Sequence, residues 1–236
     1  MRWNRNHRGL NLTVLAGLLF LTAVFVPITP HSRECIGPQR LSDHVLFLDA
    51  GHGGEDGGAV SVTGKPESGI NLAIVLRLDA LCGFFGVSTV LTRQDDASLK
   101  DKNSKTLAQM KRTDLKNRVK MVNSQKNAAL ISIHQNFFSG SNNTGAQVFF
   151  APTEGSEPLA LRCQQLLVQQ LDPSNHRQAK KISADIYLMN HVTCPAILVE
   201  CGFLSNQAEA QKLEEAGYQT KLAAAILTAY LTFSPL

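Results

Sequence analysis

The sequence predicts an α/β fold: a single domain with a mostly parallel central sheet and helices on both faces, preceded by an N-terminal hydrophobic helix. Three observations lead to this prediction. The chain has 236 residues, 44% of them hydrophobic, which is enough for one sizeable core. Short apolar runs alternate with stretches of helical periodicity, as is typical of parallel sheets. A long segment without charged residues precedes all of these elements.

The N-terminal segment is expected to enter or cross a membrane. Residues 1–30 contain Arg2, Arg5 and Arg8, no acidic residue, and no charge from residue 9 onward. About 20 apolar residues can span a bilayer as a helix, and the basic flank predicts that the following chain lies outside the cytoplasm. No Ala-x-Ala motif follows, which favours a signal anchor over a removed signal peptide. A polar tether at residues 31–43 and a folded domain at residues 44–236 complete the predicted organisation.

Charge and cysteine content argue against two kinds of site. The formal net charge of +4 comes mostly from the N-terminal arginines, so the rest of the chain is nearly neutral and lacks the basic stripe that nucleic-acid binding requires. The cysteines include no CxxC pair, which disfavours a cysteine-based zinc site, and no particular disulfide is predicted. Cys82 and Cys163 fall in apolar helical patterns and are expected to be core thiols. The five cysteines are Cys35, Cys82, Cys163, Cys194 and Cys201.

The first half of the folded region predicts a strand, a helix and a second strand. Residues 45–49 form a short continuous apolar run, as expected of a buried strand. Apolar residues then recur at helical spacing between residues 70 and 81, and Gly83 and Gly86 end this helix. The β-branched stretch at residues 87–92 predicts the next strand.

A long polar segment at residues 94–112 shows no clear periodicity and is expected to be a surface loop. Long loops in compact domains are often functional, so this one is a candidate lid or docking surface.

The second half continues the alternation of helices and strands. Helical spacing predicts helices over residues 115–122 and 159–167, and an Ala- and Leu-rich helix closes the chain. Apolar runs at residues 128–134, 146–152 and 196–200 predict three more strands. Strands separated by helices favour a parallel sheet, whose carboxyl ends meet at one edge and bind ligands there.

Residues of the types that bind metals follow three of the predicted strands. The strand at residues 45–49 leads into His52, a second leads into His134, and a third leads into Glu200. Glu67 precedes the first helix and can return to the same edge. Two histidines and a carboxylate are a standard catalytic zinc set, which leaves one position for water. The sequence therefore predicts one Zn²⁺ site, with Glu200 as the proton carrier and its pKa raised by partial burial.

Single members of this set are also compatible with different chemistry. Glycines around His52 let the backbone approach a ligand closely, but a Gly-rich turn after a strand also suits phosphate. The spacing is not G-x-G-x-x-G, and Glu55 and Asp56 would repel an anion, which disfavours phosphate. Cys201 with His134 would suit a thiol hydrolase, yet no oxyanion-hole feature accompanies the pair. The isolated histidines are expected to be ordinary surface residues: His44, His176 and His191.

Five motifs together resemble a known enzyme family. DAGHGGEDGGA, ESGINLAI, LTRQDD, SIHQN and AILVECGFLSN, in this order, resemble the zinc-dependent N-acetylmuramoyl-L-alanine amidases of the Amidase_3 family over about residues 44–233. The stretch DIYLMNHVTCPAILVECGFLSNQAEA, the length and the single hydrophobic segment are similar to the CwlD-type, germination-specific amidases of spore-forming bacteria. Ala50 stands where the family often has proline, and Ser68 and Gly69 where charged residues are common. None of these departures touches the four key positions.

The resemblance implies a zinc ion held by His52, Glu67 and His134, with Glu200 as the catalytic acid/base. Residues 44–236 would then be a zinc amidase domain acting outside the cytoplasm. It would hydrolyse the amide bond between the lactyl group of N-acetylmuramic acid and L-alanine in peptidoglycan. For the subgroup, the expected substrate is spore cortex, and the reaction is the first step toward muramic-δ-lactam. A membrane-tethered wall-binding module without catalysis and another zinc hydrolase of the cell wall remain as alternatives, and the need for an accessory activator is left open.

Overall fold

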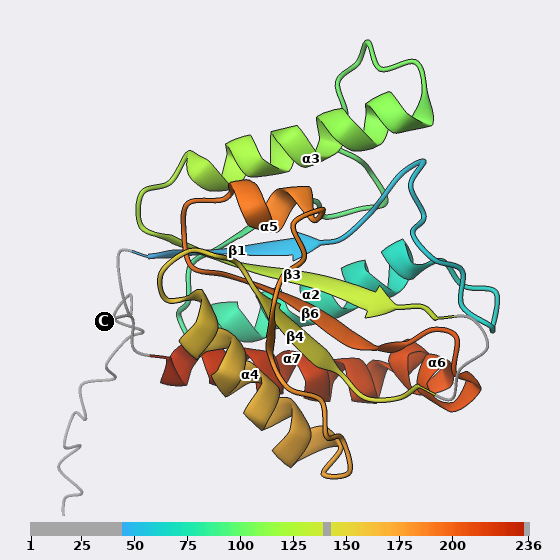
Figure 1. Ribbon diagram of the computed structural model, residues 1–236, viewed down its shortest axis with the longest axis vertical. Helices are drawn as coiled ribbons and strands as arrows, with labels where there is room; N and C mark the ends of the chain where they lie inside the picture. The colour runs from blue at the N-terminus through green and yellow to red at the C-terminus, as the bar shows by residue number, and fades with distance from the viewer. Residues whose placement is uncertain (1–43, 139–142, 234–236) are drawn as a thin grey trace, which may run out of the picture. The chain divides into compact units, whose positions relative to one another are not determined.

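The domain is built on a six-stranded sheet in the order β2-β1-β3-β6-β4-β5 (Figure 1). The first four strands in this order run parallel to their neighbours, whereas β4 runs antiparallel to β6. About ten residues separate β3 from β4, too few for the crossover helix that a parallel connection needs. The sheet is therefore mixed. Its strands are β1 (Val45–Ala50), β2 (Thr89–Leu91), β3 (Ala128–Asn136), β4 (Gln147–Phe150), β5 (Lys180–Lys181) and β6 (Ala196–Phe203).

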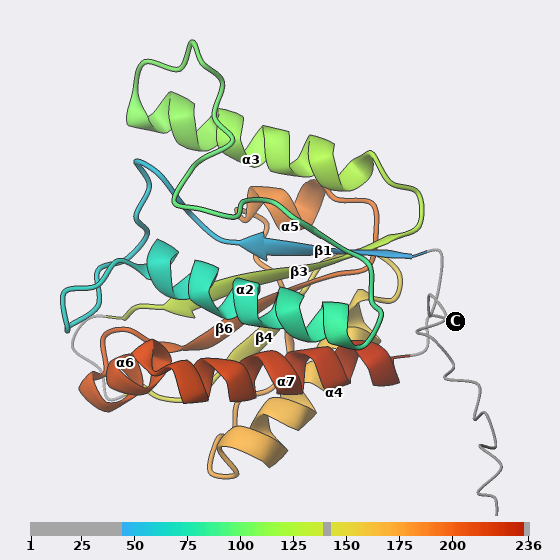
Figure 2. The same cartoon turned by 180° about the vertical axis from the view of Figure 1, so that it is seen from behind.

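Helices cover both faces of this sheet (Figures 1 and 2). On one face lie α3 and α5, and on the other α2, α4 and α7, while α6 lies at the edge where β3 and β6 end. Alternate residues of the strands supply the two cores: Leu46 and Leu48 pack toward α2 and α7, whereas Phe47 packs toward α3 and α5. The helices are α2 (Glu67–Phe84), α3 (Leu107–Asn123), α4 (Ser156–Leu171), α5 (Tyr187–His191), α6 (Gln207–Glu214) and α7 (Ala216–Thr232).

This computed structural model describes residues 44–138 and 143–233. The predicted signal anchor and tether, at residues 1–30 and 31–43, lie outside the described residues. Within the described part of the chain, no helix combines the length and the apolar character needed to cross a membrane. The four cysteines in this part are all free, and Cys82 and Cys163 are fully buried, as predicted for core thiols.

The loop predicted at residues 94–112 is shorter than expected, because α3 already begins at Leu107. Thr106 and Gln109 form a reciprocal capping box, in which each side chain accepts a hydrogen bond from the other residue's backbone N–H. A capping box marks the start of a helix. Hydrophobic periodicity alone does not reveal this start. The predictions also lacked β5, α5 and α6, which are short elements stabilised by tertiary contacts rather than by their own periodicity.

Candidate metal centre and active site

The predicted site residues do meet at the edge where the parallel strands end. His52 lies two residues after β1, and Glu67 is the first residue of α2. His134 in β3 and Glu200 in β6 are directly paired in the strand register. Both strands run on beyond these residues, so His134 and Glu200 lie within strands rather than at or past their ends.

The two-residue period of a strand explains why these paired side chains share one face. Leu130 in β3 and Leu198 in β6 pack into the core beneath α3 and α5. Side chains two or four positions apart in a strand point to the same face of the sheet. Glu200, two residues after Leu198, and His134, four after Leu130, therefore face the α3 side of the sheet.

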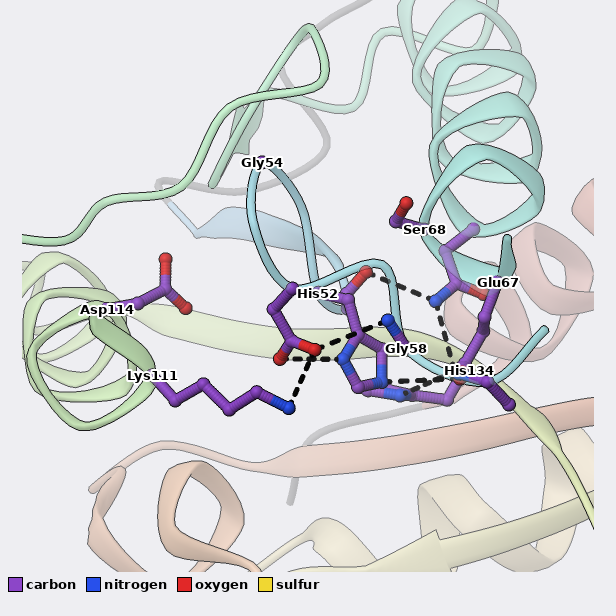
Figure 3. A network of polar contacts seen from close by, with 12 residues as sticks. His52, Gly54, Gly58, Glu67, Ser68, Lys111, Asp114 and His134 are labelled. Carbon is purple, nitrogen blue, oxygen red and sulfur yellow. Dashed lines mark hydrogen bonds and ion pairs between the residues drawn. The ribbon is translucent and has the colours of Figure 1, made fainter. Parts of the chain in front are cut away.

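His52, Glu67 and His134 form the candidate metal centre (Figure 3). One potential ligand atom from each residue lies within 4.8 Å of the other two. Glu67 stands between the histidines: its Oε2 lies 3.3 Å from His52 Nε2, and its Oε1 lies 3.1 Å from His134 Nδ1. Two imidazole nitrogens and one carboxylate oxygen could therefore hold one metal ion.

Two glycines provide the space in which these ligands lie. A Cβ atom on Gly51 would lie 2.2 Å from two atoms of the His134 ring, and one on Gly58 would lie 2.6 Å from Glu67 Oε2. Gly58 also has φ +70°, a conformation that other residues rarely adopt. The glycines around His52 thus serve the close approach that the sequence predicts.

Replacing Gly51 with alanine is expected to displace the His134 ring and to weaken binding of a divalent metal ion by at least about tenfold, as loss of ligand orientation usually does. The measurement is competition with a chromophoric chelator. Gly69→Ala is the control, because a Cβ there meets nothing within 4 Å and the site lies in the first turn of α2. That change should leave metal affinity unaltered and stabilise the fold by up to about 1 kcal/mol. Equal affinities for the two variants would show that Gly51 does not support the ligand.

The charges of the metal centre are strongly coupled. Burial disfavours ionisation of Glu67, but hydrogen bonds from His134 and His52 outweigh burial and hold the pKa of Glu67 far below its usual range. Burial also opposes a charged His52, yet Glu67 and Asp56 outweigh it and raise the pKa of His52 to about 9. Without a metal, the centre is therefore an ion pair of a glutamate carboxylate and a protonated histidine.

Helix α3 holds His52 from two directions. Asp56 Oδ2 lies 3.0 Å from His52 Nδ1, and Lys111 of α3 lies 2.8 Å from the other carboxylate oxygen of Asp56. Arg118, about two turns further along α3, donates to the His52 carbonyl oxygen at 2.8 Å. His52 has φ +62°, a costly conformation for a residue with a side chain. The contacts from α3 stabilise it and direct Nε2 toward Glu67.

Two buried arginines that the sequence analysis did not identify support the same loop. Arg93 donates to the carbonyl oxygens of Ala50, Gly51 and Ser68. Arg118 binds Asp49, Asp114 and the Ala50 carbonyl oxygen, and is 1% exposed. The four-residue spacing of Asp114 and Arg118 could have suggested a helical ion pair. Nothing local in the sequence connects Arg118 with Asp49.

Glu200 lies beside the candidate metal centre in a cavity of about 350 Å³. Its Oε2 atom is buried and has no hydrogen-bond partner among the described residues. Burial outweighs the opposing effect of His134 and raises the pKa of Glu200 to about 7, as expected. The cavity is also lined by His52 and His134, by Lys111 of α3, and by residues 185–188 before and in α5. An unpartnered carboxylate of this pKa can accept and release a proton near neutral pH.

The thiol-hydrolase alternative does not fit this geometry. Cys201 is 1% exposed and packs in the core on the side of α2 and α7, among residues such as Val199. Burial and the neighbouring Glu200 raise the pKa of the Cys201 thiol well above its usual range. A buried thiol that resists ionisation is a poor nucleophile.

Comparisons with known proteins found a matching family and similar solved structures. The profile of the N-acetylmuramoyl-L-alanine amidase family Amidase_3 matches residues 46–231. The germination-specific N-acetylmuramoyl-L-alanine amidase of Bacillus subtilis is 37% identical over 195 residues, covering 82% of this chain and 81% of the relative. The solved CwlD amidase of Clostridioides difficile, in complex with the GerS lipoprotein, is 39% identical with a TM-score of 0.76, covering 80% of this chain and 97% of that one. An N-acetylmuramoyl-L-alanine amidase of Clostridium difficile 630 is 29% identical with a TM-score of 0.69, covering 80% and 96%.

Proposed function

This chain belongs to the Amidase_3 family of N-acetylmuramoyl-L-alanine amidases, and on that premise we propose that it hydrolyses the amide bond between the lactyl group of N-acetylmuramic acid and L-alanine in peptidoglycan. The observation that carries the proposal is the convergence of His52, Glu67 and His134 beside the unpartnered carboxylate of Glu200. A module that only binds the wall has no need for three metal ligands next to a proton carrier.

The donor set fits zinc. Zinc takes histidine nitrogen and carboxylate oxygen in catalytic sites with three protein ligands, and His52, Glu67 and His134 offer this combination. The glycines that keep the ligands close to one another, and Asp56 behind His52, are the support that such sites need. When bound, zinc supplies a Lewis acid that polarises a carbonyl oxygen and acidifies water.

The protein's own groups manage the proton and the orientation of the site. Glu200 accepts the proton of the attacking water and delivers it to the L-alanine nitrogen as the amide bond breaks. A pKa of about 7 suits both halves of this task, because the group must gain and lose a proton in one cycle. Asp56 and Arg118 keep the His52 ring and backbone in place throughout.

The physiological setting of this activity is the spore cortex, where the reaction is the first step toward muramic-δ-lactam. Support comes from the B. subtilis relative, whose name is that of a germination-specific amidase. The uncharged segment at residues 9–30 anchors the chain in a membrane, the tether at residues 31–43 follows, and the catalytic domain acts outside the cytoplasm. The C. difficile relative was solved in complex with a lipoprotein, so a lipoprotein is a partner to test.

The direct test combines metal analysis with product analysis. The full-length protein is purified, its zinc content measured, and the protein incubated with spore cortex and with vegetative sacculi before and after chelation. Mass spectrometry should find stem peptides with free L-alanine amino termini only from the zinc-loaded protein, and more from cortex. Zinc binding with no products would favour the wall-binding module, and internal peptide cuts or acetate would favour another zinc hydrolase. A protein that binds no zinc would overturn the proposal.

Zinc affinity is expected to rise with pH. Because the pKa of His52 is raised to about 9 in the metal-free protein, zinc must displace a proton from it at any lower pH. Apparent affinity should therefore increase about tenfold per pH unit up to about pH 9 and then level off. Chelator competition at several pH values measures this slope, after correction for the chelator's own protonation. In Asp56→Asn, which removes one cause of the raised pKa, the plateau should begin at lower pH; a flat profile in wild type would contradict the expectation.

A further inference from the structure

The edge of the domain opposite the proposed active site carries an exposed aromatic pair. Phe84 at the end of α2 is 80% exposed and Phe85 is 48% exposed, and their rings meet edge to face at 5.2 Å. Leu231 near the end of α7 is 38% exposed. Figure 2 shows that α2 and α7 end at the same side of the domain, where β1 begins. We call the surface formed by Phe84, Phe85 and Leu231 the amino edge.

The cavity beside the amino edge has several apolar lining residues and no acidic one. It has a volume of about 400 Å³ and is lined by Gly86 and Val87 after α2, by Leu231 and Phe233, and by His44. These residues therefore lie close together in space, although they come from three parts of the chain. Of the residues that line this cavity, Lys126 is the one with a permanent charge, and none is acidic. Exposed aromatic side chains next to a lysine are suited to contact with a lipid bilayer that has anionic headgroups.

The chain enters the domain at this edge. His44, the first described residue, lines the cavity, and the 13 residues before it form the predicted tether. Thirteen residues can span at most about 45 Å. The uncharged segment at residues 9–30 precedes the tether, so a bilayer that holds this segment lies within reach of the amino edge.

We propose that the amino edge rests on the lipid bilayer, with Phe84 and Phe85 in the interfacial region and Lys126 facing anionic headgroups. Parallel strands begin at the amino edge and end at the candidate metal centre, so this contact would direct the cavity beside Glu200 away from the bilayer and toward the wall. The inference rests on the membrane anchor in the proposed function. It adds a contact by which the folded domain itself, and not only its anchor, meets the lipid.

The test places a fluorescent reporter at the edge of the full-length chain. Trp3 is the chain's one tryptophan, so Trp3→Phe provides a silent background. Phe84→Trp is the reporter. Val62→Trp is the matched control, because the native residue is 48% exposed and its backbone N–H donates to the carbonyl oxygen of Leu204 just after β6, at the opposite edge of the domain. Each protein is reconstituted into vesicles of phosphatidylethanolamine and phosphatidylglycerol, with and without brominated acyl chains. Flotation then verifies that the protein is associated with the vesicles before fluorescence is measured.

Brominated lipid is expected to quench Phe84→Trp strongly and to leave Val62→Trp unchanged. Adding Lys126→Gln should lower the ratio of docked to undocked domain about fivefold, the value of one basic residue at an anionic surface. Unquenched Phe84→Trp in chains that float with vesicles would overturn the inference and point to a protein partner at this edge. Chains that do not float would overturn both the anchor and the contact, while release of stem peptides from soluble glycan would still test the amidase activity separately.

Discussion

Replacing Glu200 with glutamine is expected to abolish amidase activity while leaving zinc bound. The glutamine is nearly isosteric, but it cannot take a proton from water or pass one to the leaving nitrogen. General acid–base groups typically contribute about 10²–10⁴-fold to a rate, so kcat should fall by at least that factor. Zinc content should stay at the wild-type level, because the three proposed ligand atoms belong to His52, Glu67 and His134. Metal analysis and quantified release of stem peptides from the same preparation measure both effects.

The matched control for this experiment is Glu157→Gln. This variant makes the same chemical change at an exposed residue in the first turn of α4, away from the sheet edge where the cavity beside Glu200 lies. Its activity and zinc content should equal those of wild type. Full activity in Glu200→Gln would remove Glu200 from the mechanism, and joint loss of zinc and activity would show that it acts as a ligand instead.

Replacing Arg118 with methionine is expected to destabilise the domain severely. Arg118 is 1% exposed and forms ion pairs with Asp49 at 2.6 Å and Asp114 at 2.7 Å. Burial opposes ionisation of Asp49, but Arg118 and hydrogen bonds from Ser132 and Thr92 lower its pKa to about 2. Removing the arginine leaves a buried charge without its partner, which typically costs about 3–5 kcal/mol. Urea unfolding of the metal-free protein measures this loss.

The control for the arginine experiment lies on the same helix. Arg112→Met makes the same substitution at an exposed position of α3 and should change the free energy of unfolding by less than about 0.5 kcal/mol. Arg118→Met should also weaken zinc binding, because Arg118 donates to the carbonyl oxygen of His52. If the two variants unfold at the same urea concentration, the Arg118 network contributes no net stability.

Local patterns in the chain were sufficient to predict the α/β fold class and to propose four residues that the structure places near one another. Short β-branched and apolar runs identify β1, β3 and β6, because buried parallel strands need continuous apolar sequence. Such strands must present their carboxyl ends at one edge, so the polar residues that follow the runs can be assigned to one site from their positions in the chain alone. His52 follows β1, and His134 and Glu200 lie near the ends of β3 and β6, whereas Glu67 reaches the same edge as the first residue of α2.

The support of the site depends on contacts between distant parts of the chain, which no local pattern encodes. Arg118 reaches Asp49 across 69 positions, and Lys111 reaches Asp56 across 55, so neither pair produces a periodic signal. The antiparallel pairing of β4 with β6 likewise depends on tertiary structure: the connection from β3 to β4 is short, and β4 pairs with β6 rather than with β3. Hydrophobic periodicity indicates which side of a helix or strand is buried. It does not indicate which residues contact a buried charge. The sequence by itself therefore identified the proposed ligands of this candidate centre, and the packing of α3 against the sheet decided how they are held, because the contacts of a buried charge form only when separate elements pack together.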